Sequence, residues 1–463
     1  MRKIVIVGAG ITGLTTAYWL KKSGFDVTVI EKESVVGGNI QTLSNNGTLF
    51  DSGPNSGLET TPLISQLVEE LNLKGEFCYA NPSANKRYIL RDEILHPLPM
   101  NPKSFIQSKL FSTKGKLRLF LEPFIRKSED GYYQSIAQFV RRRLGEEFLD
   151  YAINPFVSGV FAGDPEQLSV KSAFPKLYRL EEVYGGLVKG MIKGKKERKK
   201  RGEKSKQNAE MFSFKSGMKV LPEALFKFLQ DSVVLNESVQ KVQNVRQLTD
   251  GKWKIETSVE NRTKTYTADG VLFTIPAYEV SKVLEHLDGK LSNHLNSIYY
   301  PPVIVMNLLF KKQDIGQELD GFGFLIPEKE KKTFLGSIWG SVIFPNRAND
   351  DEASFTIFIG GAKEPKLLDN DINSRIDEVL NQFKQIMKTK SEPISIKYRI
   401  WEKAIPQYNL GHIEHEKYFD EFEKRFPGIF LGGNYRGGIS VGDCIKNSEV
   451  NFNRLREFII NNL

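Results

Sequence analysis

A short run of β-branched residues, followed by apolar residues at helical spacing, is the first regular pattern along the chain. Residues 3–7, KIVIV, have the composition of a buried parallel strand, and the apolar residues of 14–20 recur three and four positions apart. Gly24 follows as a helix-ending glycine, and residues 27–30, VTVI, form a second apolar run. The pattern predicts a complete β–α–β unit within the first part of the chain.

The pattern farther along predicts both strands and helices, with no internal repeat. Apolar or alternating residues predict strands in four stretches: 233–275, 302–311, 333–361 and 426–434. Helical spacing predicts helices in four others: 62–73, 134–152, 371–388 and 448–460. Such a mixture is typical of a protein with several layers of sheet and helix.

Composition narrows the class of protein. With 463 residues, 40% of them hydrophobic, the chain has material for a large core and more than one domain. This excludes a collagen-like, disordered or disulfide-stapled protein. Cys78 and Cys444 are the two cysteines, too few for a disulfide framework or a four-cysteine zinc site, which favours a reducing compartment.

No segment has the length and hydrophobicity of a membrane-spanning helix. Such a helix needs about 18 uninterrupted apolar residues. The apolar run at residues 3–13 is also too short and too interrupted by glycine for a signal peptide. We expect a cytoplasmic protein, either soluble or peripherally associated with a membrane, on the cytoplasmic side of the inner membrane if the source is bacterial.

The net charge of +9 is concentrated in one segment. Residues 193–206 hold nine Lys and Arg against two Glu, and so carry +7 of it. Three interpretations are open: contact with anionic lipid headgroups, contact with nucleic acid, or a solvated loop. No helix-turn-helix or zinc module accompanies the segment, so we expect no nucleic-acid partner. We predict a loop of about 15–20 residues that faces an anionic membrane surface.

The predicted β–α–β unit carries a dinucleotide-binding fingerprint. Gly8, Gly10 and Gly13 form G-x-G-x-x-G between the strand and the helix, and Glu31 ends the second strand 18 residues later. Gly8 permits the tight turn, Gly10 lets the backbone approach a pyrophosphate, and Gly13 allows the helix to pack closely. The helix N-terminus attracts phosphate, and Glu31 can accept hydrogen bonds from a ribose.

Two further segments indicate a flavin rather than a nicotinamide. Gly37-Gly38 after the ribose acid, and GGNYRGGISVGD at 432–443, resemble motifs of the glutathione-reductase-like flavoproteins, in the amine-oxidase and phytoene-desaturase branch. Relatives usually carry Arg or Lys where Asn39 stands. The resemblance implies FAD. The implied cofactor-binding residues are Gly8, Gly10, Gly13, Glu31, Lys32, Gly37, Gly38, Asn39, Gly53, Pro54, Val239, Gly433, Asn434, Val441 and Gly442. We interpret Cys444 as a packed thiol rather than a covalent flavin attachment point.

Longer motifs resemble the oxygen-dependent protoporphyrinogen oxidases, especially the plant-organelle type. They are NKRYILRDE at 85–93, NPFVSGVFAGDP at 154–165 and MFSFKSGMKVLPEAL at 211–225. The resemblance covers nearly the whole chain. It implies oxidation of protoporphyrinogen IX to protoporphyrin IX in heme biosynthesis, by three two-electron cycles on FAD. O2 accepts the electrons and gives H2O2.

The resemblance also implies a substrate site without a catalytic acid or base, because conjugation of the macrocycle drives the proton losses. The five histidines show no metal-ligand spacing, so we expect no metal. Arg87 matches a position that binds a propionate, and an Arg fork suits a carboxylate. The implied substrate-binding residues are Arg87, Asn55, Phe156, Gly159, Leu309, Leu325 and Trp339.

The implied fold class is a multidomain α/β and α+β protein with three domains. The glutathione-reductase-like FAD (Rossmann) domain comprises 1–75, 225–277 and 404–463. A mixed β-sheet substrate domain comprises 76–98, 191–224 and 278–403, and a helical membrane-associated domain comprises 99–190. Aromatic and aliphatic residues alternate with cations at 105–126, as on an interfacial surface, although a core-facing helix pair is the alternative.

Several alternatives stay open at this point. The substrate could be coproporphyrinogen III, or the chain could be another oxidase or desaturase of the same branch. A non-enzymatic protein like the Rab escort proteins shares the first glycine loop without using FAD, but does not need the motif at 432–443. A homodimer is also left open.

Overall fold

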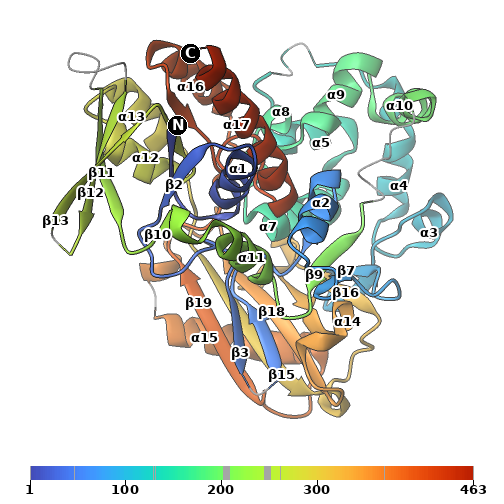
Figure 1. Cartoon of the computed structure of the whole chain (residues 1–463). Helices are drawn as coiled ribbons and strands as arrows, with labels where there is room; N and C mark the ends of the chain where they lie inside the picture. The colour runs from blue at the N-terminus through green and yellow to red at the C-terminus, as the bar shows by residue number, and fades with distance from the viewer. Residues whose placement is uncertain are drawn as a thin grey trace.

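Three groups of elements make up the molecule. The computed structural model describes residues 2–45, 47–128, 130, 132–201, 209–244, 252–260, 262–369 and 371–461. Figure 1 shows a parallel sheet with its helices in the upper part, a larger mixed sheet below it, and a group of helices to the right. The elements of each sheet come from distant parts of the chain, so the sheets are assembled from discontinuous segments.

The first sheet has five strands, all parallel, and confirms the predicted β–α–β unit. Its order is β10 (Val233–Val234), β2 (Asp26–Ile30), β1 (Lys3–Val7), β14 (Gly270–Phe273) and β20 (Ile429–Leu431). Helix α1 (Ile11–Lys22) connects β1 to β2. Strand β1 lies near the middle, and four of its five residues are buried because helices cover both faces.

Alternate residues of this sheet point into two separate cores. Ile4 and Ile6 pack against α1 and three further helices, which are α2 (Pro62–Glu70), α11 (Val220–Leu229) and α17 (Val441–Asn461). Val5 and Val7 pack on the opposite side, against α12 (Ala277–Leu284), α13 (Gly289–Asn296), α16 (His412–Arg425) and a small antiparallel sheet. That sheet has the order β11 (Ser238–Asn244), β12 (Trp253–Val259) and β13 (Arg262–Ala268). The predicted border after residue 224 falls inside α11, and the border after residue 277 falls at the start of α12. Both helices pack on the parallel sheet.

The second large sheet is mixed and has seven strands. Its order is β19 (Ser395–Trp401), β15 (Val303–Lys311), β18 (Glu352–Gly360), β17 (Gly336–Trp339), β16 (Gly321–Leu325), β7 (Lys86–Arg91) and β8 (Ile94–Pro97). Ile304 and Leu308 of β15 share a core with α15 (Ile372–Met387). Because side chains alternate along a strand, Val303, Val305 and Leu309 lie on the opposite face. The predicted strand at 302–311 and helix at 371–388 are confirmed.

Shorter elements connect the two sheets. One sheet pairs β5 (Gly57–Leu58), β9 (Met211–Phe214) and β6 (Phe77–Tyr79). Another pairs β3 (Thr42–Asn45) with β4 (Thr48–Asp51). Helix α14 (Gly340–Ile343) follows β17. The helices predicted at 62–73 and 448–460 are present, although α17 begins earlier, at Val441.

The helical group lies between residues 102 and 201. Its helices are α3 (Pro102–Gln107), α4 (Thr113–Phe120), α5 (Ile136–Arg143), α6 (Glu146–Phe148), α7 (Asn154–Phe161), α8 (Val170–Ala173), α9 (Pro175–Tyr184) and α10 (Leu187–Arg201). The single helix predicted at 134–152 is wrong in one respect: it breaks after Arg143, because Gly145 takes a positive φ of 93°. A π-helical turn, η2 (Leu149–Ile153), completes the segment.

The prediction that the basic segment is a loop is also wrong for the part that the structure describes. Helix α10 continues to Arg201, and residues 202–208 lie outside the described residues. Lys and Arg are good helix formers, and cations toward the carboxyl end of a helix interact favourably with its dipole. The Glu122 carboxylate also accepts hydrogen bonds from the first backbone N–H groups of this helix, at Leu187 and Val188.

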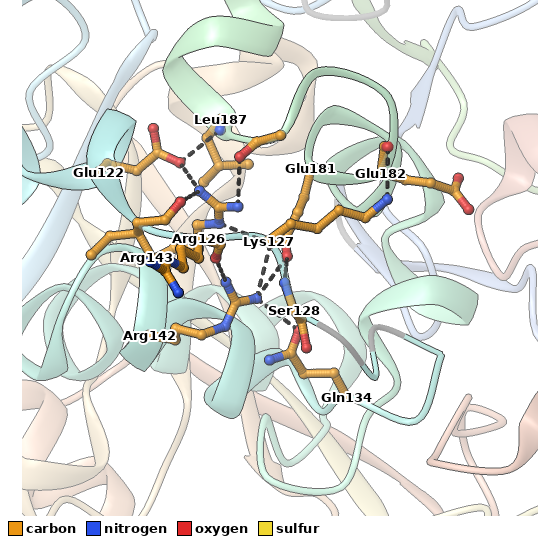
Figure 2. A network of polar contacts seen from close by, with 12 residues as sticks. Glu122, Arg126, Lys127, Ser128, Gln134, Arg142, Arg143, Glu181, Glu182 and Leu187 are labelled. Atoms are coloured by element: carbon orange, nitrogen blue, oxygen red, sulfur yellow. Dashed lines mark hydrogen bonds and ion pairs between the residues drawn. The ribbon is translucent and has the colours of Figure 1, made fainter.

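A buried ion network holds this helical group together (Figure 2). The fully buried Arg143 guanidinium donates to Glu122 at 2.9 Å, to Glu181 at 2.8 Å and to the Gly185 carbonyl at 2.8 Å. Glu181 also pairs with Arg142. Glu122 lies in η1 (Glu122–Phe124), so the network joins this turn to α5, α9 and the start of α10. Among the described residues, no helix has the length and apolar character needed to span a bilayer.

Candidate functional site

A cavity of about 960 Å³ is lined by residues of both large sheets. Part of its wall comes from the ends of β1 and β2 and from the N-termini of α1 and α17. Another part is apolar and comes from the second sheet and its neighbours. The apolar residues are Val160, Ala162, Val303, Val305, Leu335, Phe358, Ala404 and Ile405. The cavity therefore joins a polar, backbone-rich end to an apolar end.

The polar end is built on the first glycine motif. Gly8, Gly10, Ile11 and Thr12 line the cavity where α1 begins. No side chain caps this helix, and a Cβ on Gly10 would meet nothing within 4 Å. The helix N-terminus therefore offers its N–H groups and positive dipole to open space, as a pyrophosphate requires.

Gly13 supports this end of the cavity from behind. It does not line the cavity, and a Cβ built on it would overlap the carbonyl oxygen of Gly8. The close packing expected from the sequence is thus a contact between α1 and the turn that follows β1. Any side chain at this position has to move backbone atoms.

Glu31 is held at the edge of the cavity by two backbone groups. Its carboxylate accepts hydrogen bonds from the N–H of Ala9 at 2.7 Å and of Glu33 at 3.0 Å. The side chain is 8% exposed and lines the cavity, as the neighbouring Lys32 does. The ammonium of Lys32 lies 3.8 Å from Glu279 on α12. The ribose-binding position predicted for Glu31 is therefore compatible with its placement.

The second glycine segment lies beside the first. The N–H of Gly37 donates to the Ala9 carbonyl at 2.8 Å, so the two segments form one wall. The other predicted cofactor residues that line the cavity are Gly38, Asn39, Gly53, Pro54 and Val239. Residues separated by more than 200 positions are thereby brought to one surface.

The C-terminal glycine turn closes the same cavity. Asn434 and Val441 line it, whereas Gly433 and Gly442 do not. A Cβ on Gly442 would lie 2.7 Å from the Thr60 hydroxyl, so this glycine lets α17 pack against the segment after β5. Cys444 lines the cavity, and burial raises the pKa of its thiol to about 11. The thiol is therefore protonated at neutral pH and is a poor nucleophile.

Of the predicted substrate residues, Asn55 and Gly159 line the cavity, and the other five do not. Leu325 lies behind Gly159, where a Cβ would overlap its Cδ2 atom. Leu309 shares the sheet face of Val305, farther along β15. Phe156 is 40% exposed and its ring packs near Phe174.

Trp339 lies on the other side of the second sheet. It is 1% exposed and packs with Phe324 and Phe355 in the core that α15 covers. The sheet register places it opposite Phe355, on the face away from Leu309. The structure therefore does not bring Trp339 together with Leu309 and Leu325.

Arg87 is exposed, and its guanidinium lies 5.4 Å from the ring centre of Phe322. The sheet register aligns it with Gly323, Ile338, Thr356 and Asn307 on neighbouring strands. The last three of these line a small cavity of about 20 Å³ that Asn55 also lines. Arg87 therefore lies on the sheet face that borders this small cavity beside Asn55. Unlike Asn55, Arg87 does not line the large cavity.

Three of the cavity residues that the sequence analysis missed are cations or N–H donors on and after β19. The Trp401 indole N–H donates to the Ser52 carbonyl at 2.7 Å, beside Gly53. The Arg399 guanidinium lies 4.4 Å from the Trp401 ring centre, and Lys403 lies 4.1 Å from that of Tyr278. No acidic side chain of the described residues is within ion-pair distance of Arg399 or Lys403. The alternation of apolar and polar residues at 394–400 could have indicated this strand, but it gave no sign that the strand borders the cavity.

The arrangement fits a flavin dinucleotide. Within the described ranges, no group of three or more His, Cys, Asp or Glu residues is placed to hold a metal ion. The helix N-terminus without a side-chain cap, the carboxylate at the end of β2 and the second helix N-terminus at α17 surround one cavity. These features define a dinucleotide-binding fold.

Comparisons with known proteins agree with this class. The model of the flavin containing amine oxidoreductases matches residues 11–448. Protoporphyrinogen oxidase 2 of Arabidopsis thaliana is 34% identical over 96% of this chain and 92% of its own length. The coproporphyrinogen III oxidase of Bacillus subtilis is 28% identical over 96% of both chains. The chain belongs to the flavin containing amine oxidoreductase family and, within it, to the protoporphyrinogen oxidases.

Solved structures show the same fold. A candidate protoporphyrinogen oxidase from Exiguobacterium superposes with a TM-score of 0.80, at 22% identity, over 98% of this chain and 99% of the other. A putrescine oxidase superposes with a TM-score of 0.69, at 16% identity, over 98% of this chain and 99% of its own. The protein is a flavin-dependent oxidoreductase whose cofactor is FAD. The non-enzymatic alternative is therefore wrong.

Proposed function

We propose that this enzyme oxidises protoporphyrinogen IX to protoporphyrin IX. The observation that carries the proposal is the match to protoporphyrinogen oxidases over 96% of the chain, which spans both ends of the cavity. The substrate loses six electrons and six protons in three steps. Three O2 molecules accept them and become three H2O2. Bound FAD supplies the two-electron acceptor for each step.

The residues of this chain bind and orient the substrate in this proposal. The apolar end of the cavity accepts a flat apolar macrocycle, and the Gly159 backbone forms part of its wall, with Leu325 packed in the space that a side chain would need. Asn55 contributes a polar group beside the macrocycle, and Arg87 binds a propionate at the edge. Leu309, Leu325 and Phe156 support the surrounding walls, whereas Trp339 lies in the core on the opposite face of the second sheet and takes no part. We assign no acid or base to the chain, because aromatisation of the macrocycle favours the loss of its protons.

Coproporphyrinogen III is the second candidate substrate. Its support is that coproporphyrinogen III oxidases of Bacillus subtilis and Staphylococcus aureus match this chain at 28% and 27% identity over at least 96% of it. The two substrates differ in charge, since coproporphyrinogen carries four carboxylates and protoporphyrinogen carries two. The number of cations near the site therefore affects which of the two porphyrinogens binds better.

An assay of the FAD-loaded protein with both porphyrinogens under air distinguishes the candidates. We expect porphyrin fluorescence from protoporphyrinogen IX, with three H2O2 formed for each porphyrin. Faster turnover of coproporphyrinogen III would assign the second substrate instead. Inactivity with both substrates, in protein that contains FAD, would contradict the proposed function.

Replacing Arg87 with alanine is expected to raise the KM for protoporphyrinogen about 10-fold and to leave kcat and FAD content unchanged. A guanidinium–carboxylate hydrogen bond contributes about 1.5–3 kcal/mol, and 1.4 kcal/mol corresponds to a factor of 10. Steady-state kinetics measure the effect. Lys86→Ala is the matched control, because Lys86 is the neighbouring exposed cation of β7, pairs with Asp320 and does not line the large cavity. Arg399→Ala tests the alternative carboxylate partner, because Arg399 is an exposed cation that lines the cavity. The opposite result, a raised KM in Arg399→Ala alone, would transfer the carboxylate contact to Arg399.

We also propose that the helical group binds a membrane surface. Large apolar side chains are exposed on and around α3, α4, η1 and α10, and we name them the apolar surface. They are Met100, Ile106, Leu117, Phe120, Leu121, Phe124, Met191 and Ile192, each more than half exposed. Exposed cations such as Lys103, Lys109 and Lys114 accompany them. An apolar surface bordered by cations suits the interface of an anionic membrane, and the proposed location is peripheral, on its cytoplasmic side.

Replacing Phe120 and Phe124 with serine is expected to weaken binding to vesicles that contain anionic lipid at least 10-fold. Each phenylalanine contributes about 1.5–3 kcal/mol when it is removed from water. Sedimentation with the vesicles measures the effect. Ile394→Ser is the control, because this side chain is 50% exposed but precedes β19, in the lower part of Figure 1. Equal binding by the double variant and the native protein would contradict the membrane proposal.

A further inference from the structure

Tyr408 lies outside the cavity, yet its hydroxyl contacts the C-terminal turn that lines it. We propose that Tyr408 is a positioning residue for FAD, which holds the turn at residues 434–440 in its binding geometry. The inference depends on the FAD site and not on which porphyrinogen is the substrate. Nothing in the sequence motifs singled out this residue.

The hydroxyl of Tyr408 makes two hydrogen bonds to the turn. It donates to the Asn434 carbonyl at 2.8 Å and accepts from the N–H of Gly438 at 2.8 Å. Tyr408 is 5% exposed, and burial raises the pKa of its hydroxyl well above the usual value. The hydroxyl therefore stays protonated and can fill both roles at once. It connects the start of the turn, at Asn434, to Gly438 four residues later.

The bridged turn carries residues of the cavity wall. Asn434, Ile439 and Ser440 all line the cavity, and Ile439 packs against the same core as Tyr408. Gly437 and Gly438 both have positive φ, at 84° and 130°, and glycine has the most freedom to leave such a conformation. The turn therefore needs contacts from outside itself to keep one shape. The Tyr408 hydroxyl provides two of them at once.

Tyr408 is itself held both at its ring and at its backbone. It stacks on the His412 ring with a centre-to-centre distance of 4.1 Å. Burial lowers the pKa of His412 to about 3, so the stacked ring is neutral at physiological pH. The backbone carbonyl of Tyr408 accepts a hydrogen bond from the N–H of Ser169 at 2.9 Å, where α8 begins. A fixed ring makes the hydroxyl a fixed point for the turn.

Tyr408→Phe tests the proposal, because it keeps the ring and its stacking and removes only the hydroxyl. We expect the dissociation constant of FAD to rise about 10-fold and the visible circular dichroism of bound FAD to change. The melting temperature of the FAD-free protein should stay the same. In the FAD-free variant the turn can relax, so that water pairs with the Asn434 carbonyl and the Gly438 N–H, which are only partly buried. FAD binding requires the geometry in which both groups have lost the Tyr408 hydroxyl, so the cost falls on binding. A 10-fold rise corresponds to about 1.4 kcal/mol. Titration of the FAD-free protein with FAD measures the constant.

Tyr418→Phe is the matched control, since it removes a hydroxyl that bonds Asp288 and does not touch the turn. The proposal is overturned if Tyr408→Phe binds FAD like the native protein, or if its FAD-free form melts at a correspondingly lower temperature. Should Tyr408→Phe fail to fold, His412→Leu removes the stacking ring and leaves the hydroxyl. We then expect a smaller rise in the dissociation constant, and no rise would overturn the proposal. In the native protein, normal FAD binding without turnover of either porphyrinogen would count against the proposed function and leave the role of Tyr408 unaffected.

Discussion

Gly13→Ala is expected to yield a colourless protein that no longer retains FAD. The added Cβ would overlap the carbonyl oxygen of Gly8, which is backbone and cannot rotate away. To relieve the overlap, α1 must shift away from the turn after β1. The N–H groups at the start of α1 would then leave the pyrophosphate position. The flavin absorbance of the purified protein measures the loss.

Gly289→Ala is the control for this substitution. Gly289 is also in the first turn of a helix, α13, but a Cβ there would meet nothing within 4 Å. We expect this variant to purify with the native amount of FAD. Full FAD occupancy in Gly13→Ala, with native affinity on titration, would show that α1 and the turn can separate without loss of the site.

Arg143→Met is expected to lower the free energy of unfolding by about 3–5 kcal/mol, the usual cost of breaking a buried ion pair. The guanidinium is fully buried between Glu122 and Glu181, and neither carboxylate has access to water that could replace it. The substitution leaves both negative charges buried with fewer partners. Urea denaturation, followed by far-ultraviolet circular dichroism, measures the change.

Arg141→Met separates this effect from the loss of a surface charge. Arg141 lies two residues earlier on the same helix and pairs with Glu146 and Glu166, but its side chain is 42% exposed. Exposed pairs of this kind contribute about 0–1 kcal/mol. Equal destabilisation by the two variants would contradict the idea that burial of the network decides its importance.

The cofactor end of the site could be predicted from the sequence because its signals are local. A strand, a glycine turn and a helix follow one another within residues 3–22, and each has its own pattern. Twelve of the predicted cofactor residues line the cavity, and Gly13 and Gly442 support it through close packing instead. Backbone conformation and helix ends are determined over a few residues, so the sequence shows them directly.

The substrate end could be predicted only in part, because it depends on which face of a sheet each residue occupies. Leu309 and Trp339 look alike in the sequence, as large apolar residues in strands. The register of β15, β18 and β17 places them on opposite faces. Arg399 and Trp401 line the cavity because β19 pairs with β15, and these two segments lie about 90 residues apart in the sequence. Register between distant strands leaves no local pattern.

The charged residues show the same difference between what local sequence patterns reveal and what contacts between distant segments decide. The sequence by itself determined a dinucleotide fold, its glycine turns and a concentration of cations at 193–206, since these depend on residue type and short-range spacing. Only the tertiary structure decided that residues 187–201 form a helix capped by Glu122, and that Arg143 is buried while Arg141 is exposed. The reason is physical: burial and ion pairing depend on which distant groups arrive beside a side chain, and those neighbours exist only in the folded chain.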